Sequence, residues 1–178
     1  ILEDIKGRGG VDKVWCLGDV VGYGPDPREC IEALRQIDHI GVAGNHDLAA
    51  IGKIGTDEFN PDAAASCHWT AKQLTSADIA YLGKLPMVIE EGNFTLVHGS
   101  PRDPVWEYLL IASQAKDNFT LFNTQFCLVG HSHVPLVFRC DETGDFSGRR
   151  FLTDVRLVPG TERMIINPGG VGQPRDGD

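Results

Sequence analysis

Four short apolar runs in this chain each end at a glycine and at side chains that can bind a metal ion. The four clusters are Gly18-Asp19, Gly44-Asn45-His46-Asp47, His98-Gly99 and Gly130-His131-Ser132-His133. Short, continuous apolar runs are typical of strands buried on both faces of a sheet. Ligands of open α/β sheets bind outside the carboxyl ends of the strands. We therefore expect these four clusters, which are far apart in sequence, to converge on one crevice.

The residue types in these clusters indicate a metal site, although each cluster alone is a weak signal. One aspartate, one asparagine carbonyl and three histidines form an oxygen and nitrogen ligand set without sulfur, which suits manganese, iron, zinc or nickel. A carboxylate can bridge two such ions about 3.5 to 4 Å apart, an arrangement that activates water and stabilises an in-line displacement at both oxygens. His39 and His68 lack this context, and we interpret them as structural.

The order of helical and strand-like segments predicts an α/β fold in a single domain, residues 1–178. Helices and buried strands alternate in the first half and strands dominate the second, which indicates a β-sandwich of mixed sheets flanked by helices. We expect helices over residues 27–36, 76–82 and 113–122, and another from Asn60-Pro61 onward. We expect strands over residues 11–17, 39–43, 87–90, 94–97, 126–129, 136–140, 151–157 and 164–166.

Composition and charge narrow the possible partners and the compartment. No apolar run approaches the roughly 18 residues of a membrane span. The net charge of -9 disfavours non-specific binding to nucleic acid, which requires a surplus of lysine and arginine. A phosphate substrate stays possible, because bound cations can make an acidic site locally positive. Five cysteines without C-x-x-C spacing favour a reducing compartment over a disulfide framework, so we expect a cytoplasmic protein with Cys16 and Cys127 in its core.

The four clusters, in this order, resemble the calcineurin-like metallophosphoesterase superfamily. The resemblance runs through Gly18-Asp19-x-x-Gly22, Gly44-Asn45-His46-Asp47, Val97-His98-Gly99 and Gly130-His131-Ser132-His133, and it spans roughly Val11 to Gly172. Gly22-Tyr23-Gly24-Pro25 and Asn167-Pro168-Gly169-Gly170-Val171-Gly172 are similar to its small bacterial phosphodiesterase branch. The resemblance implies the fold of that superfamily and hydrolysis of a phosphate ester, as a phosphodiesterase or phosphatase, by a metal-bridging hydroxide.

The resemblance also implies the metal ligands. Asp19 would bridge two divalent ions, most simply Mn²⁺, with Fe, Zn or Ni as alternatives. The ligands Asn45, His98 and His131 would complete the shell of one ion, and His133 would bind the other. The expected substrate is a phosphate-ester small molecule or a nucleotide.

Four further residues are candidates for contact with the substrate or for proton transfer near the metals. His46 is similar to the family's non-ligand histidine, which contacts the phosphate and protonates the leaving oxygen, and Asp47 would hold its imidazole. Arg102 could reach a phosphate through its guanidinium, with an ion pair to Asp103 or at the surface as the alternative. Tyr23 is a weaker candidate for contact with the substrate.

One element of the family pattern is absent from the sequence. The family begins with a strand ending in Asp-x-His, which supplies two more ligands to the ion bound by His133, and residues 1–178 contain no such motif. Residues 1–6 resemble the end of the helix that follows that strand. We therefore expect a metallophosphoesterase domain shortened at both ends.

Three alternative functions can be weighed. Protein serine/threonine phosphatases carry Gly-Asp-x-Val-Asp-Arg-Gly and Gly-Asn-His-Glu, where this chain has Gly22-Tyr23 and Asp47, so we set this reading aside. A hydrolase of dinucleotide polyphosphates has the same chemistry and remains open. A non-catalytic scaffold of this fold is the third alternative, and the retained His46 argues against it.

Overall fold

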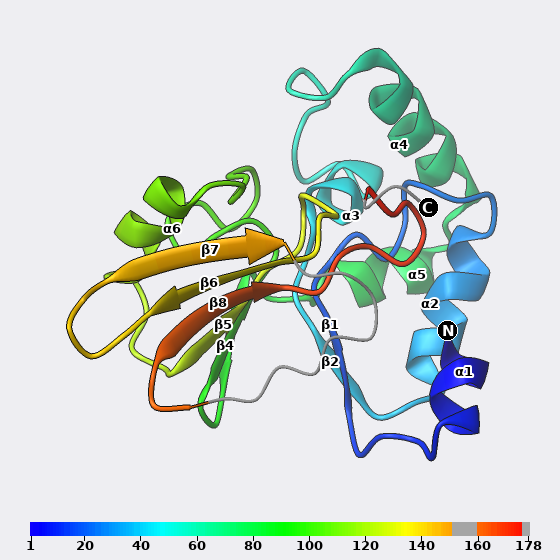
Figure 1. Ribbon diagram of the computed structural model, residues 1–178. Helices are drawn as coiled ribbons and strands as arrows, with labels where there is room; N and C mark the ends of the chain where they lie inside the picture. Colours follow the sequence, from blue (N-terminus) through cyan, green and yellow to red (C-terminus); the bar gives the residue numbers. More distant parts are fainter. Residues whose placement is uncertain (151–159, 176–178) are drawn as a thin grey trace.

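The strands form two sheets, and the strands that pair in parallel have their carboxyl ends at one central region (Figure 1). The structure is a computed structural model that describes residues 1–150 and 160–175. β1 (Val14–Cys16) and β2 (His39–Gly41) form a parallel pair. The six-stranded sheet has the order β3-β4-β5-β8-β6-β7. Its strands are β3 (Val88–Glu91), β4 (Phe94–Val97), β5 (Phe126–Leu128), β6 (Leu136–Cys140), β7 (Phe146–Arg150) and β8 (Arg163–Asn167).

The middle of the six-stranded sheet is parallel and buried on both faces. β4, β5 and β8 run parallel, whereas β3, β6 and β7 join as antiparallel neighbours. Alternate side chains of a strand point to opposite faces. Cys127 and Ile165 accordingly join one core cluster, whereas Phe126 and Met164 join another. The continuous apolar runs in the sequence are thus explained by cores on both sides of these strands.

The two sheets touch through their N-terminal ends. The ring of Trp15 on β1 lies edge-on to Phe94 on β4, with 4.7 Å between the ring centroids. Lys13 and Glu91 form an ion pair nearby, with 3.2 Å between Nζ and Oε1. These contacts hold β1 beside β4, so the strand ends that carry the predicted ligands lie close together.

The helices begin where local sequence signals predict them. α2 (Pro27–Arg35) and α4 (Pro61–Gln73) each have proline in the first turn, where its missing N–H costs nothing. Asn60 caps α4 by accepting a hydrogen bond from the Ala63 amide, 3.0 Å away. Thr75 and Asp78 form a capping box at α5 (Ser76–Leu82). The remaining helices are α1 (Leu2–Gly7), α3 (Asn45–Ala50) and α6 (Ala112–Asn118).

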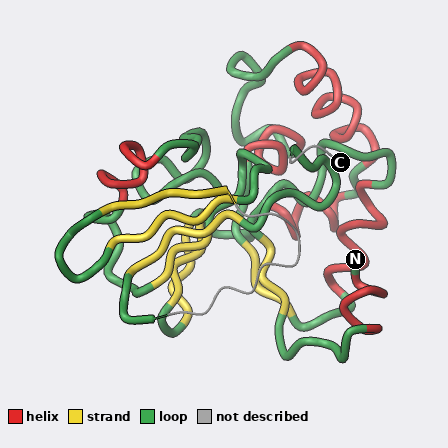
Figure 2. The backbone as a smooth tube through the Cα atoms, viewed as in Figure 1, coloured by secondary structure: helices red, strands yellow, loops and turns green. Residues whose placement is uncertain are grey.

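Helices cover the two sheets unequally, as Figure 2 shows. α6 packs on the six-stranded sheet beside β6 and β7. α2, α3 and α5 share a core of Val21, Ile31, Ala50 and Leu82 on the side of β1 and β2. The expected α/β architecture with mixed sheets and flanking helices is confirmed.

Several predicted boundaries differ from the observed ones. The helix predicted over residues 113–122 is the shorter α6, and the first strand is limited to β1. α3 and β7 were not predicted, because α3 spans only six residues and β7 is an exposed edge strand of sequence FSGRR. The strand predicted over residues 151–157 lies outside the described residues.

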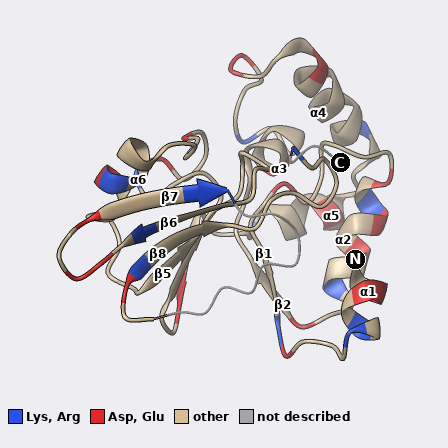
Figure 3. Ribbon diagram, viewed as in Figure 1, with Lys and Arg blue, Asp and Glu red and all other residues tan. Residues whose placement is uncertain are grey.

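Charged residues lie mainly on the helices and at the ends of the strands, and the middle of the six-stranded sheet is largely uncharged (Figure 3). This distribution follows from burial of the sheet on both faces, since an unpaired buried charge is unfavourable. Within the described part of the chain, no helix combines the length and apolar character that crossing a membrane requires.

Candidate metal centre

Four of the five predicted metal ligands meet where strands from both sheets end. Asp19 follows β1, and Asn45 begins α3 shortly after β2. His98 directly follows β4, and His131 comes shortly after β5. Ligand atoms of Asp19, His98 and His131 lie within 4.8 Å of one another. The expected convergence of the clusters is therefore present in the fold.

The imidazole of His98 lies at the middle of this group. Its Nδ1 lies 2.6 Å from the carbonyl oxygen of Leu17, and a carbonyl only accepts, so Nδ1 donates. In the neutral ring Nε2 then carries a lone pair. This Nε2 lies 3.0 Å from Asn45 Oδ1, 3.2 Å from His131 Nδ1 and 3.4 Å from Asp19 Oδ2. A lone pair thus faces two oxygen acceptors in the protein interior.

This arrangement fits a divalent cation. Asp19 Oδ2 is buried without a hydrogen-bond partner, which is unfavourable unless another group satisfies it. Oxygen and imidazole donors without sulfur suit Mn, Fe, Zn or Ni, as the sequence predicts. The residues present could therefore hold a metal ion, with Asn45 Oδ1 as a further donor.

Burial sets the protonation of the ligands. It raises the pKa of Asp19 to about 7, a shift that a hydrogen bond from the His46 amide opposes. Burial lowers the pKa of His98 and lowers that of His131 to about 3. The imidazoles are therefore neutral, as metal ligation requires. A cation at this point would also favour the ionised form of Asp19.

The backbone is left-handed at three predicted ligands. Among the described residues, the non-glycine residues with positive φ are Asp19 (54°), His131 (59°) and His133 (57°). Such conformations cost about 1–3 kcal/mol each and cluster at functional sites. Gly18 is also left-handed, with φ of 91°, and a Cβ there would lie 2.7 Å from His98 Nδ1. The glycine therefore permits the close approach of the ligand loops.

His133 lies beside this group without belonging to it. Its Nδ1 donates to the carbonyl oxygen of Gln173, 2.8 Å away, which leaves the lone pair on Nε2. Asn167 braces the loop before it, with Nδ2 donating to Ser132 Oγ at 3.0 Å and to the Gly130 carbonyl. The spacing of the two histidines, with Ser132 between them, thus places one in the three-residue group and one next to it. That His133 binds a second ion stays a prediction.

Asp47 has a different partner from the predicted one. Its Oδ1 accepts a hydrogen bond from the Val21 amide at 3.1 Å, and its Oδ2 accepts one from the Gly44 amide at 3.0 Å. These bonds join the loop after β1 to the start of α3. Asp47 thus holds the backbone around Asp19 and Asn45 instead of the imidazole of His46.

The ring of His46 is held by groups that the sequence did not indicate. Cys67 Sγ, on α4 and fully buried, lies 3.4 Å from His46 Nδ1. Tyr23 packs on one side of the ring at 4.1 Å between centroids, and Phe59 lies edge-on at 5.0 Å. Burial lowers the pKa of His46 to about 4. The imidazole is therefore neutral and fixed in orientation.

The two candidate substrate contacts have different surroundings. Tyr23 lies between His46 and His133, whose ring centroid is 5.0 Å from its own. Arg102 instead forms an ion pair with Glu107, and Asp117 lies 3.6 Å from its Nη1. The structure therefore agrees with the ion-pair alternative for Arg102, although the partner is Glu107 and not Asp103.

A cavity of about 610 Å³ opens beside His46. Tyr23 and Asn45 line it, together with residues that the sequence analysis missed: Phe59, Trp106, Tyr108 and Arg175. Only the frequent occurrence of aromatic side chains at binding sites could have pointed to these residues, since they come from three separate loops. The cavity connects the candidate metal centre with solvent.

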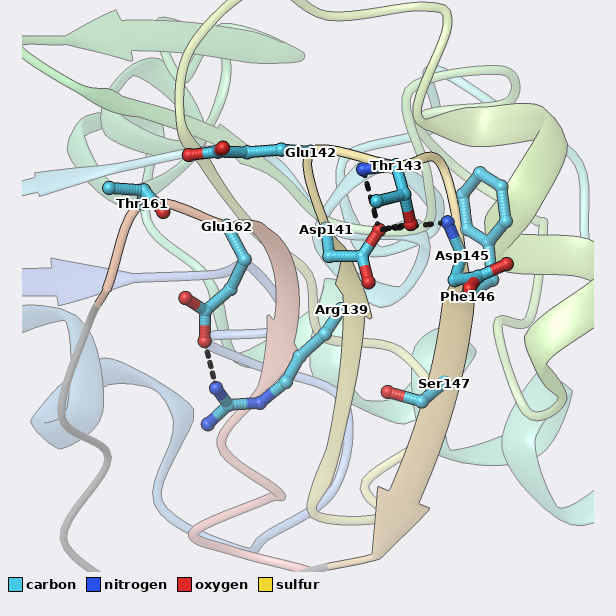
Figure 4. A pocket seen from close by; sticks show the side chains of 9 residues that line it. All are labelled: Arg139, Asp141, Glu142, Thr143, Asp145, Phe146, Ser147, Thr161 and Glu162. Atoms are coloured by element: carbon cyan, nitrogen blue, oxygen red, sulfur yellow. Dashed lines mark hydrogen bonds and ion pairs between the residues drawn. The ribbon is translucent and has the colours of Figure 1, made fainter.

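Another hollow, of about 490 Å³, lies away from the centre at the outer ends of β6 and β7 (Figure 4). Arg139 and Glu162 form an ion pair there, and Asp141 accepts hydrogen bonds from the Thr143 and Asp145 amides. These polar groups pair with each other, and the residues lining this hollow include none of the predicted site residues.

Fold and site together define an α/β protein with a candidate metal centre between two sheets. The chain belongs to the calcineurin-like phosphoesterase superfamily, because residues 1–178 match the family described as "Calcineurin-like phosphoesterase superfamily domain". The resemblance found in the sequence is thereby confirmed, and divalent metals are general in this family.

Individual relatives agree with this assignment. The chain is 48% identical to a metallophosphoesterase from Sphaerobacter thermophilus, with a TM-score of 0.85, covering 99% of this chain and 74% of that one. An uncharacterized protein of Methanocaldococcus jannaschii is 39% identical over 99% of this chain and 71% of its own length. A symmetrical bis(5'-nucleosyl)-tetraphosphatase of Aromatoleum aromaticum is 32% identical over 49% of this chain and 33% of its own length.

Proposed function

We propose that this chain hydrolyses a phosphate ester, either a diester or a monoester, at a centre of two divalent ions. The observation that carries the proposal is the lone pair of His98 Nε2 directed at Asn45 Oδ1 and Asp19 Oδ2. One ion would be held by Asn45, His98 and His131. The other ion would be held by His133, and Asp19 would bind both ions. Bound divalent ions would supply Lewis acidity and an activated water. Mn²⁺ is the first choice, with Fe, Zn and Ni as alternatives.

His46 is proposed as the proton donor to the leaving oxygen. Its Nδ1 faces Cys67, so Nε2 is the nitrogen left for the substrate. The pKa of about 4 keeps the ring neutral before a substrate binds. An anionic phosphate beside the ring favours its charged form, so substrate binding would raise this pKa and supply the proton. Asp47 supports the reaction by holding the backbone of the centre.

Hydrolysis of a dinucleotide polyphosphate is the second candidate. It is favoured by the similarity to a symmetrical bis(5'-nucleosyl)-tetraphosphatase, which covers 49% of this chain. A non-catalytic scaffold is the less economical alternative, because it leaves the buried oxygen Asp19 Oδ2 without a binding partner.

Metal titration and a hydrolysis assay test the proposal. Protein stripped with a chelator is titrated calorimetrically with Mn²⁺, Co²⁺, Ni²⁺ and Zn²⁺, then assayed with p-nitrophenyl phosphate and bis(p-nitrophenyl) phosphate. We expect metal binding and metal-dependent release of nitrophenol. His98→Gln should lose both. His68→Gln is the matched control, because His68 is exposed and contacts the Thr56 hydroxyl instead of the predicted ligands. Full metal binding without hydrolysis of either ester would support the scaffold reading.

A further inference from the structure

The cavity beside His46 is lined by aromatic rings. Phe59 and Trp106 meet edge to face, with 5.1 Å between centroids, and Phe59 also touches His46. Tyr23 stacks on the ring of His46, with 4.1 Å between centroids. Tyr108 stacks on the ligand His131 at 4.0 Å between centroids and stays 41% exposed. Aromatic walls of this kind bind flat groups through stacking and edge contacts.

The charges in this cavity are arranged in two groups. Arg175 lies on the side of the metal centre, since its Nη1 is 3.5 Å from the Ser132 carbonyl and its charge lowers the pKa of Asp19. Glu58 and Asp62 line the cavity at the start of α4. Both carboxylates are exposed and available to hydrogen-bond donors.

This arrangement suits one phosphate and one flat ring. A phosphate at the metal centre would lie within the field of Arg175, which can bind phosphate oxygens in a bidentate manner. A chain of further phosphates through the cavity would meet the like charges of Glu58 and Asp62. A heterocycle with N–H groups would instead stack on the rings and donate to these carboxylates.

We propose that this cavity binds the organic group of the substrate and selects esters with a single phosphate and a flat nitrogen heterocycle, that is, nucleoside monophosphate esters. The proposal rests on the proposed phosphoesterase function and deepens it. Phe59 and Trp106 would hold the ring, and Glu58 and Asp62 would reject polyphosphates.

Hydrolysis of two esters that share the same leaving group tests the proposed contacts of Phe59 and Trp106 with the heterocycle. The p-nitrophenyl ester of thymidine 5'-phosphate is compared with ethyl p-nitrophenyl phosphate, which lacks the nucleoside. We expect kcat/KM to favour the thymidine ester, and Trp106→Ala or Phe59→Ala to reduce that preference by about 5- to 100-fold, the range for loss of one base stack. Trp69→Ala is the matched control, because Trp69 lies on α4 and is 43% exposed outside the cavity.

The carboxylates are tested with a polyphosphate. Glu58→Gln with Asp62→Asn should raise kcat/KM for diadenosine tetraphosphate relative to the thymidine ester. Asp57→Asn, a neighbouring exposed residue that does not line the cavity, should leave the ratio unchanged. A wild-type preference for the tetraphosphate that these substitutions do not alter would overturn the proposal.

A binding measurement separates failure of the subsite from failure of the reaction. Calorimetric titration with thymidine 5'-monophosphate should give binding that Trp106→Ala weakens and Trp69→Ala does not. If the protein binds the nucleotide in this way but cleaves no ester, the proposed nucleoside subsite is supported and the proposed hydrolysis is contradicted. Cleavage of both p-nitrophenyl esters with equal kcat/KM would support the proposed hydrolysis and contradict the proposed nucleoside subsite.

Discussion

The imidazole of His46 has neighbours on three sides and one nitrogen left for a substrate. Tyr23 and Phe59 fix the plane of the ring, and Cys67 faces Nδ1. A proton donor must be oriented toward the leaving oxygen before its pKa matters. The packing thus gives His46 the fixed orientation that the proposed role demands, without placing it among the metal ligands.

Replacing His46 should separate proton donation from metal binding. We expect His46→Gln to keep its metals and to lose about 10²- to 10⁴-fold in kcat on an alkyl or nucleoside leaving group, the range for loss of a general acid. The loss should be much smaller for a nitrophenyl leaving group, which departs without a proton. Metal titration and kcat on both ester classes provide the measurement. Equal losses on both classes would leave only a role in positioning the phosphate.

Replacing Cys67 should act through His46. Cys67 Sγ lies 3.4 Å from His46 Nδ1, and a hydroxyl in its place can donate or accept a hydrogen bond as the thiol can. We expect Cys67→Ser, which keeps a donor, to retain kcat on an alkyl ester within a few-fold, and Cys67→Ala to lower it about 10-fold, as for loss of one hydrogen bond. In both variants, kcat on a nitrophenyl ester and the affinity for metal should change little. Equal losses of kcat in Cys67→Ser and Cys67→Ala would contradict a role of Cys67 in holding His46.

At the scale of elements, the short helix α3 carries both a predicted ligand and the brace of the centre. Asp47 bonds the Gly44 amide at the helix start and the Val21 amide of the loop after β1. This connection fixes Asn45 relative to Asp19 across the two chain segments. The position of the ligands therefore depends on one buried carboxylate that is not itself a predicted ligand.

Asp47→Ala should lower both stability and metal affinity. It leaves two buried amides without partners, at about 1–3 kcal/mol each. Asp78→Ala is the matched control, since Asp78 caps α5 through the same kind of capping box away from the centre. We expect both variants to have lower melting temperatures but only Asp47→Ala to bind Mn²⁺ more weakly. Equal metal affinity of the two variants would show that the brace is only structural.

The sequence was most informative where local chemistry determines structure. Proline near the start predicted where α2 and α4 begin, the helix predicted over residues 76–82 coincides with α5, and apolar runs predicted β5 and β6. The ligand clusters were predictable because each follows a strand. The contact of Cys67 with His46 and the place of Arg175 in the cavity were not, because tertiary packing alone brings these residues there. α3 is too short to give a periodic signal.

At the scale of the whole molecule, the buried carboxylate of Asp19 should make stability depend on pH and metal. Its pKa is about 7 in the metal-free fold and about 3.9 in an unfolded chain. The folded state therefore disfavours ionisation, so this contribution to stability is complete below about pH 4 and is lost as pH rises to about 7. A bound cation favours the ionised form and should remove this loss.

Urea unfolding from about pH 4 to about pH 8 measures the effect. We expect chelator-treated wild type to lose stability relative to Asp19→Asn as the pH rises, and added Mn²⁺ to restore the wild type alone. The histidines with lowered pKa values have the opposite pH dependence, and comparison of the two proteins cancels it to first order. Burial and the charge of Asp19 also raise the pKa of Asp47 to about 7, so the difference between the two proteins measures Asp19 together with its repulsion of Asp47. If the stability of wild type changes with pH in the same way with and without Mn²⁺, the assignment of Asp19 as a metal ligand is contradicted.

The predicted ligands are divided between the two sheets: Asp19 and Asn45 follow β1 and β2, and His98 and His131 follow β4 and β5. An ion shared by these residues is thus a cross-link between two halves of the molecule that otherwise meet through contacts that include ring packing, the Lys13–Glu91 ion pair and the hydrogen bond from His98 to the Leu17 carbonyl. Removing it should lower the cooperativity of unfolding as well as the activity, and calorimetry should then resolve separate transitions for the halves. Metal content would in that case determine whether this chain behaves as one thermodynamic unit or two.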